Sequence, residues 1–233
     1  MSDALYLSLW YPNLRLVELP DKLTAVLTAF AAHGGEPLVY AATVWPVSWS
    51  ETPVFERVWG RLAKPANGDP GRGPDMGPNM GAEPRQAVEQ ALELLHDDYA
   101  YEFQIGWNLW EMESAPGFPP HEQGPVRGGP GFDPRWVRAP RLVRVTGFGP
   151  LFDDGVYEQE GHIRIDFGSD APFLEEDADL DAAAARRVEE NVRQLVDLTQ
   201  DAGKNSGATA RLLWSELGES LAQRLAARLG MRN

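Results

Sequence analysis

The sequence predicts a single α+β domain with two layers, in which helices pack on one face of a mixed or antiparallel sheet of about five strands. Short apolar runs rich in β-forming residues alternate with helical periodicities, in the order β-α-β-α-β-β-β-α-α. The clearest strand, 99–113, is apolar on one side only, which is typical of an antiparallel sheet covered on one face. Gly/Pro-rich insertions at about 60–84 and 114–140 separate elements that cannot close a core alone, so we expect one domain over 1–233.

The N-terminal part of the chain predicts a β-α-β unit. The run 5–11 is rich in β-forming residues and predicts a strand. A helix is expected from Pro20 to the glycines 34–35, because its apolar residues recur at i, i+3, i+4 and i+7 (Leu23, Val26, Leu27 and Phe30). A second strand is expected over 38–47. When both strands share a sheet, this connection predicts parallel, right-handed pairing.

The middle of the chain predicts a helix, a long strand and a hairpin. The helix begins at Glu83-Pro84, and Trp107 is expected in the core because it lies on the apolar side of the strand 99–113. Residues 142–146 and 157–167 predict a hairpin with a wide loop. We expect ion pairs across it, such as one between Arg144 and a carboxylate.

Two helices are predicted to end the domain. Asp179 or Asp181 is suited to cap a helix that runs to about residue 201, and the segment 203–207 is expected to break it. A last helix is expected from about 209 to 229. Its leucines recur every four residues, a spacing typical of core packing: Leu213, Leu217, Leu221 and Leu225.

Composition limits the classes of function. The chain has 21 Lys+Arg against 35 Asp+Glu, a formal net charge of −14, which disfavours binding to nucleic acids or anionic membranes. The absence of cysteine excludes disulfides, thiol nucleophiles and iron–sulfur sites. The start lacks a signal-peptide pattern and no run reaches about 18 apolar residues, so we expect a cytoplasmic protein. Neither 147–150 nor 203–204 fits a nucleotide-binding motif, and no cofactor is predicted.

The predicted strand 157–167 carries the residues of a candidate catalytic site. Alternation places five polar side chains on one face: Glu158, Glu160, His162, Arg164 and Asp166. A histidine between carboxylates would have a raised pKa and would suit general acid or base catalysis, with His162, Asp166 and Glu160 as the catalytic residues. Asp153 and Asp154, with Asp170, suggest a site for a hard divalent cation. The alternative is the solvent face of a hairpin held by ion pairs.

A candidate binding surface lies on the polar side of the strand 99–113. Its residues are Glu102, Gln104, Asn108 and Trp110, joined from the hairpin by Glu158, Arg164 and Asp166. An aromatic residue on a polar sheet face is a plausible contact anchor, since tryptophan is enriched in binding hot spots. The alternative is that the insertion 114–140 folds over Trp110 and covers it.

Two classes of function follow from these residues. The first is a non-enzymatic domain that binds a protein partner, with a basic partner favoured because residues 151–190 have a net charge of −10. In acidity and size the chain resembles the single-domain immunity proteins of bacterial toxin systems, which implies stoichiometric neutralisation of a partner. The second is a hydrolase-like enzyme that uses the cluster around His162, with or without a divalent cation. An enzyme requires a pocket where these groups converge, whereas a binding protein requires an exposed patch with anchors.

Overall fold

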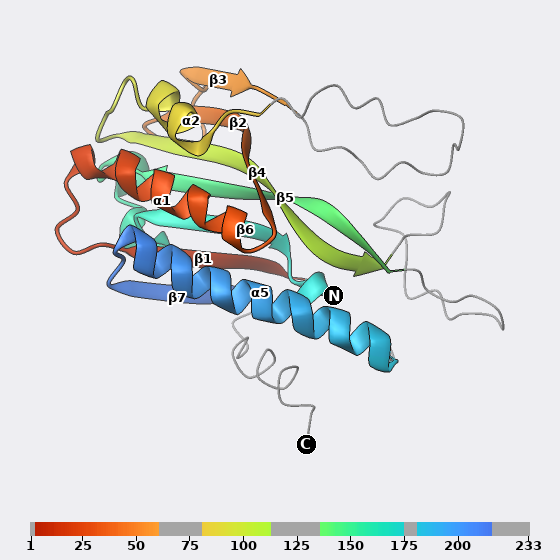
Figure 1. The fold of residues 1–233 in the computed structure, drawn as a ribbon. Helices are drawn as coiled ribbons and strands as arrows, with labels where there is room; N and C mark the ends of the chain where they lie inside the picture. The colour runs from red at the N-terminus through yellow and green to blue at the C-terminus, as the bar shows by residue number, and fades with distance from the viewer. Residues whose placement is uncertain (1–2, 61–80, 113–135, 175–180, 216–233) are drawn as a thin grey trace, which may run out of the picture.

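The computed structural model describes residues 3–60, 81–112, 136–174 and 181–215, and the fold is α+β (Figure 1). Within these ranges one sheet holds β1 (Ala4–Trp10), β2 (Gly35–Pro46), β3 (Phe55–Val58), β4 (Tyr99–Met112), β5 (Trp136–Phe148), β6 (Ile163–Ser169) and β7 (Ala210–Ser215). The α-helices are α1 (Leu19–Ala32), α2 (Pro84–Ala91), α3 (Tyr157–Glu160), α4 (Ala171–Leu174) and α5 (Ala182–Ser206), with short 3-10 turns at Leu16–Glu18 and Phe152–Asp154.

The sheet has the strand order β3-β2-β4-β5-β6-β1-β7, and every neighbouring pair is antiparallel. Four antiparallel steps separate β1 from β2, so these two strands point the same way, as expected. They do not pair, however, because β4, β5 and β6 lie between them. The predicted pairing within the first β-α-β unit is therefore wrong. The insertion of a later three-strand meander is a long-range event that the local sequence of β1 and β2 does not encode.

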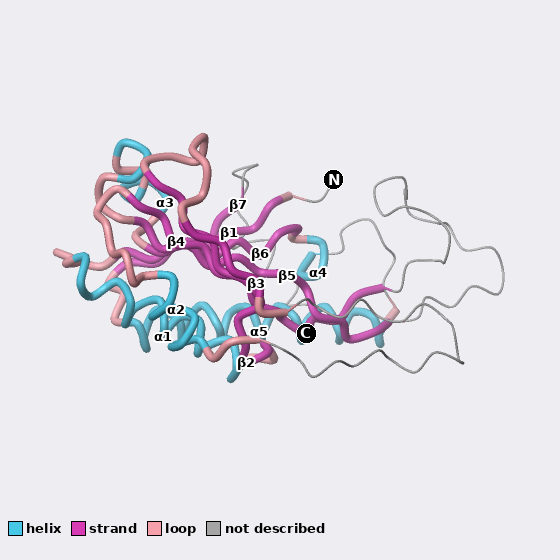
Figure 2. The backbone as a smooth tube through the Cα atoms, turned by 90° about the horizontal axis from the view of Figure 1, so that it is seen from above, coloured by secondary structure: helices cyan, strands magenta, loops and turns pink. Residues whose placement is uncertain are grey.

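The three long helices lie where the sequence predicts them, together on one face of the sheet (Figure 2). Asp181 caps α5, because its Oδ1 accepts hydrogen bonds from the N–H groups of Ala183 at 2.8 Å and Ala184 at 2.7 Å. The helix continues through Gly203, where a break was predicted, and ends at Gly207. Gly207 has a φ of 76°, the left-handed conformation that ends many helices.

The predicted strand 157–167 is wrong in its first part. Residues Tyr157–Glu160 form α3, and β6 begins only at Ile163. Between them Gly161 has a φ of 89°, and a Cβ at this position would lie 2.8 Å from the backbone nitrogen of Leu9. The chain therefore turns sharply at a glycine, and Glu158 and Glu160 do not share a strand face with Arg164.

The predicted last helix is also wrong over its described part. Ala210–Ser215 form β7, which pairs with β1 at the edge of the sheet. The rings of Tyr6 and Trp214 stack across this pair with centroids 4.6 Å apart. Leu213 thus lies in a strand, whereas Leu217, Leu221 and Leu225 lie outside the described residues, as do most of both insertions. The described sheet has more strands than predicted because the short edge strands β3 and β7 were not anticipated.

The main core lies between the sheet and the helices and is centred on Trp107. This side chain is fully buried, as predicted, and contacts the rings of Phe30, Phe167 and Phe173. Its Nε1 donates a hydrogen bond of 2.8 Å to the carbonyl of His33, at the end of α1. Since a buried indole N–H requires an acceptor, this bond ties the end of α1 to the sheet.

On the side of β4 that faces β2, the outer part of β4 forms backbone hydrogen bonds with a side chain and not with a strand. β2 pairs with β4 as far as the Gly35–Trp107 pair, and β4 continues beyond that point to Met112. The Oδ1 of Asn191, from α5, accepts from the Trp110 N–H at 2.9 Å, and its Nδ2 donates to the Trp110 carbonyl at 2.9 Å. Nδ2 also donates to the carbonyl of Pro172 at 2.9 Å. The fully buried Asn191 amide thus takes the place of a neighbouring strand.

Candidate functional site

The face of the sheet opposite α1, α2 and α5 is lined by two rows of side chains, which we call the open face. One row runs Ala41, Gln104, Arg144, Asp166, Tyr6 and Trp214; the other runs Thr43, Glu102, Thr146, Arg164, Ser8 and Leu212. Figure 2 shows the long helices on one side of the sheet and α3 on the other side, at one end. The open face therefore carries polar and aromatic groups that the helix layer does not cover.

Arg164 lies at the centre of an aromatic cluster at one end of the open face. Its guanidinium lies over the rings of Tyr6, Trp49 and Phe148, 5.5–5.9 Å from their centroids, and it forms an ion pair with Glu160. Glu160 comes from α3, so the helical turn that replaced the predicted strand still delivers this carboxylate to the arginine. The cluster fixes the position of Arg164 over the sheet.

The carboxylates of the open face have arginine neighbours. The Nη1 of Arg144 lies 3.3 Å from Oδ2 of Asp166, which confirms the predicted ion pair across the hairpin. Burial raises the pKa of Glu102, and the nearby Arg144 offsets part of that rise. The charges of this face therefore balance, with two carboxylates (Glu102 and Asp166) and two arginines (Arg144 and Arg164). The excess of acidic residues in the protein is located outside this face.

The structure brings together four of the residues predicted to form a binding surface and separates the other three. Glu102, Gln104, Arg164 and Asp166 lie in the two adjacent rows of the open face. Glu158 lies in α3, where its carbonyl accepts a hydrogen bond from the Trp10 indole. Asn108 and Trp110 lie farther along β4.

Trp110 does not share the open face with Glu102. Its Nε1 donates to Oε2 of Glu190 at 2.7 Å, and the guanidinium of Arg187 lies 5.5 Å from the centroid of one of its rings. Both partners belong to α5, in the helix layer. Figure 2 shows the paired ends of β4 and β5 turning toward that layer, since long strands twist along their length. The carbonyl of Asn108 likewise accepts from Gln194 of α5 at 3.3 Å.

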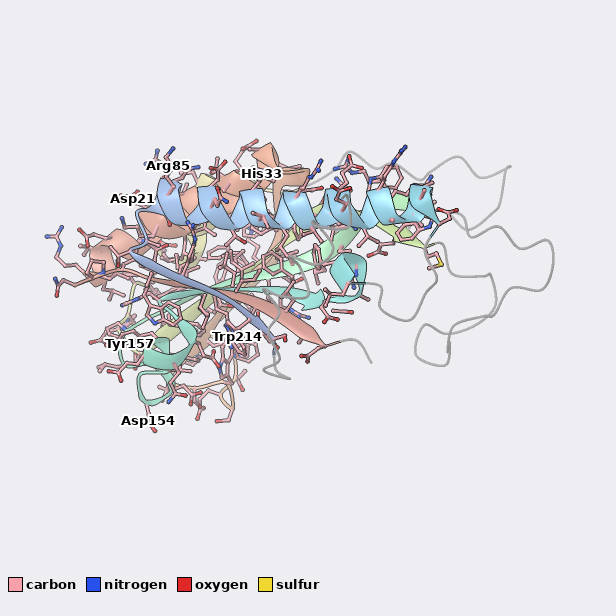
Figure 3. All side chains as sticks on the ribbon, turned by 90° about the horizontal axis from the view of Figure 1, so that it is seen from below. Asp21, His33, Arg85, Asp154, Tyr157 and Trp214 are labelled. Carbon is pink, nitrogen blue, oxygen red and sulfur yellow. The ribbon has the colours of Figure 1, made fainter. Side chains whose placement is uncertain are left out.

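Exposed carboxylates gather at one end of the sheet, on loops that bind one another. The backbone N–H of Val47 donates to the Asp98 carbonyl at 2.7 Å, and the Asp153 N–H donates to the Val47 carbonyl at 2.8 Å. We call this region the acidic end and define it by five exposed side chains: Glu51, Asp97, Asp153, Asp154 and Glu158. Figure 3 shows Asp154 at the outer tip of the loop that leads to Tyr157. The segments 46–55, 93–99 and 149–160 contain no lysine or arginine.

The acidic end also carries exposed apolar side chains and unusual backbone. Val47, Leu94 and Leu151 are 54%, 61% and 62% exposed. Val47 has a φ of 57°, a conformation that β-branched residues rarely adopt, and Asp153 and Asp154 have φ values of 46° and 56°. Such backbone persists where surrounding contacts impose it, and it is concentrated at functional sites. Neither residue stands out in the sequence as an exposed apolar side chain: Val47 was expected to end the strand 38–47, and Leu151 is a single apolar residue in a loop without periodicity.

The predicted cation site does not assemble from its three aspartates. Asp153 and Asp154 lie before β6, whereas Asp170 follows β6 and accepts a 2.9 Å hydrogen bond from the backbone of Asp3. Over the described residues, no group of three or more histidine, aspartate or glutamate side chains is arranged to hold a metal ion. Asp153 and Asp154 are therefore exposed surface charges.

His162 lies in the wall of a pocket and not, as was predicted, between carboxylates. The pocket has a volume of about 310 Å³ and is lined by Tyr11, Asn13, Leu14, Leu16, Leu19, Phe148, Pro150, Tyr157 and His162. The Nδ1 of His162 accepts from the Tyr11 N–H at 3.3 Å, and its ring lies 4.7 Å from the Tyr157 ring. Glu160 and Asp166, the predicted catalytic partners, pair with arginines instead.

Burial lowers the pKa of His162 below the ordinary value of 6.5, the opposite of the predicted rise. An NMR titration of the four histidines should therefore place the midpoint of His162 below 6.5. The unfolded chain takes up this proton at higher pH than the folded protein does, so this group removes stability as the pH falls through 6.5 toward the folded pKa. His162→Phe should flatten that part of the curve of unfolding free energy against pH. A midpoint above 6.5 would contradict the described environment.

Comparisons with protein-family models, with curated proteins and with solved structures found no match to this chain. None of the helices in the described ranges combines the length and apolar character needed to cross a bilayer. The fold and site define an α+β domain with a one-sided helix layer, an ion-paired open face and an acidic end.

Proposed function

We propose that the chain is a non-enzymatic domain that binds a basic segment of a partner protein through its acidic end. The observation that carries this proposal is the grouping of five exposed carboxylates with the exposed apolar side chains of Val47 and Leu151, on loops without lysine or arginine. Immunity-like neutralisation of the partner is the role we favour, because it requires a stoichiometric surface and no catalytic groups.

The composition of the acidic end suits a protein interface. Binding energy in interfaces is concentrated in a few apolar anchors that are surrounded by polar groups, and Leu151 and Val47 occupy the anchor positions here. Charge of one sign around such anchors speeds the encounter with an oppositely charged partner and disfavours acidic competitors. The backbone hydrogen bonds that link Val47 to Asp98 and Asp153 hold the loops in place before binding, which reduces the entropy lost on association.

The open face is a weaker candidate for this role. Its carboxylate Asp166 is paired with Arg144, and its other arginine, Arg164, is paired with Glu160 of α3, so a basic partner would meet arginines on this face. The alternative function, a hydrolase-like enzyme, needs His162 beside Asp166 or Glu160. No observation favours it, because both carboxylates make ion pairs and the ring faces Tyr11 and Tyr157.

The test begins with a partner identified by affinity capture from the native lysate at low and high salt. The double variant Asp153→Asn with Asp154→Asn removes two charges while keeping a residue type that tolerates positive φ. If each exposed charge contributes about 0.5–1 kcal/mol, the variant should bind the purified partner about fivefold to thirtyfold more weakly in calorimetric titrations. The loss should shrink at high salt.

Asp197→Asn is the matched control, because Asp197 is exposed on α5, away from the acidic end. It should bind the partner as the parent protein does. Because Asp197→Asn removes one charge and the double variant removes two, a loss of binding free energy in Asp197→Asn that is half as large or larger would reduce the effect to net charge and would contradict a local site. A partner that binds the double variant with unchanged affinity and salt dependence would also contradict the proposal.

A further inference from the structure

The pocket at His162 has the features of a binding site for a small group. Its volume of about 310 Å³ lies at the lower end of the range of ligand pockets, roughly 300–1,000 Å³, and suits a single ring. The rings of Tyr11, Tyr157 and Phe148 and the side chains of three leucines form part of the lining, and polar atoms form the rest. Such a mixed lining suits a flat group that has an apolar ring and a polar edge.

Several polar groups of this pocket are not hydrogen-bonded to the protein. Since Nδ1 of His162 accepts from the Tyr11 N–H, a neutral ring carries its proton on Nε2. Within the described residues neither that Nε2–H, nor the hydroxyl of Tyr157, nor the side chain of Asn13 has a hydrogen-bond partner. The Tyr11 hydroxyl, in contrast, bonds to Oγ of Ser206 at 2.8 Å. A ligand would therefore meet a histidine N–H donor, and it would gain most by presenting an acceptor.

The lining disfavours a charged ligand. None of the nine lining residues is an acid, a lysine or an arginine, and the lowered pKa of His162 keeps its ring neutral near pH 7. Lys22, whose Nζ lies 5.4 Å from the Tyr11 ring centroid, is not part of the lining. An ion in this pocket would lose hydration without gaining a partner of opposite charge.

We propose that this pocket binds an uncharged aromatic group that carries a hydrogen-bond acceptor, of the phenol class, with His162 Nε2–H as the donor. The group is either the side chain of a tyrosine in a partner protein or a free small molecule. The proposal concerns the isolated chain and does not depend on the acidic end.

The test uses p-cresol, which is the side chain of tyrosine, as the probe. Protein with ¹⁵N-labelled histidine is titrated, and saturable shifts of the His162 ring signals are expected. Leu16→Trp places a large side chain in the pocket and should abolish these shifts. Val17→Trp is the matched control, because Val17 is the next residue, is 68% exposed and does not line the pocket. Absence of saturable shifts in the parent protein, or unchanged shifts in Leu16→Trp, would overturn the proposal.

The role of the Nε2–H donor is tested with a second ligand, toluene, which has the same ring and methyl group but no acceptor. The parent protein should prefer p-cresol over toluene by about threefold to tenfold, the contribution of one hydrogen bond. His162→Phe keeps a ring of similar size but no donor, so it should bind both with equal affinity. If His162→Phe is folded and retains the preference for p-cresol, His162 is not the donor and the proposal fails.

A third probe separates the two sources of the aromatic group. The capped tripeptide Lys-Tyr-Lys presents the same phenol with a peptide backbone and basic neighbours. Tighter binding of the tripeptide than of p-cresol assigns the pocket to a tyrosine of a protein partner. Binding of p-cresol but not of the tripeptide assigns it to a free small molecule. Failure of the function proposed for the acidic end would leave the p-cresol result unchanged, so the two proposals fail separately.

Discussion

Asn191→Ala is expected to lower the free energy of unfolding by about 3–4 kcal/mol, because it removes three hydrogen bonds at a fully buried position. The variant leaves the N–H and carbonyl of Trp110 and the carbonyl of Pro172 without their partner. It also opens a small cavity beneath α5. Urea denaturation followed by circular dichroism measures the change.

Asn205→Ala provides the matched control for this prediction. Asn205 is exposed in the last turn of the same helix, and no hydrogen bond of its side chain is described. The same chemical change there should alter the unfolding free energy by less than about 0.5 kcal/mol. Similar losses in the two variants would mean that the Asn191 amide is not what completes the outer part of β4.

Trp107→Ala is expected to destabilise the protein by about 3–5 kcal/mol, the range for truncating a large buried aromatic side chain. Trp107 is fully buried among Phe30, Phe167 and Phe173, and the substitution also removes the hydrogen bond to the His33 carbonyl. Because this bond joins α1 to the sheet, near-ultraviolet circular dichroism should show loosened aromatic packing. Thermal or urea unfolding gives the magnitude.

Trp110→Ala is the comparison for this second prediction, since the two tryptophans lie three residues apart on β4. Trp110 is only partly buried, and its indole bonds to Glu190 near the surface. Its truncation should therefore lower the free energy of unfolding by about 1–2 kcal/mol. A larger loss for Trp110 than for Trp107 would contradict the described position of the core.

Much of the fold follows from local sequence signals. The apolar spacing in α1 and the Asp181 cap of α5 concern residues within one or two helical turns, and both predictions are confirmed. A pair between Arg144 and a carboxylate was predictable because the two strands are close in sequence and alternation places their polar side chains on one face; the structure shows that this carboxylate is Asp166. These features are determined by residues that are close together in the sequence, so a short stretch of sequence is enough to predict them.

The errors arise where distant parts of the chain decide the structure. The residues 157–160, a tyrosine followed by three polar residues, also fit one helical turn, and Gly161 has to turn the chain because Leu9 of β1 lies against it. Ala210–Ser215 form a strand because β1 offers them an edge and Tyr6 offers Trp214 a stacking partner. Helical periodicity in 209–229 contains no information about that edge.

In the candidate site, too, features set by local geometry were predictable and features set by distant contacts were not. Glu102 and Gln104 could be grouped with Arg164 and Asp166 because strand geometry places them on one face. The exposure of Leu151 and the positive φ of Val47 depend on how three loops meet, and no pattern within one loop predicts them. Trp110 was assigned to the wrong face because alternation assumes a flat sheet, whereas the long hairpin twists toward α5.

The position of β1 between β6 and β7 has a consequence for the nascent chain. Leu9 pairs with Ile163 on one side, and Trp10 pairs with Ala210, 200 residues later, on the other. At the roughly 5–20 residues per second of translation, β1 waits on the order of ten to forty seconds before both partners leave the ribosome. During that time the apolar side chains of Leu5, Leu7 and Leu9 lack the partners that bury them. The first strand to be made is thus among the last to be secured, and it is the segment on which we expect a cellular chaperone to act.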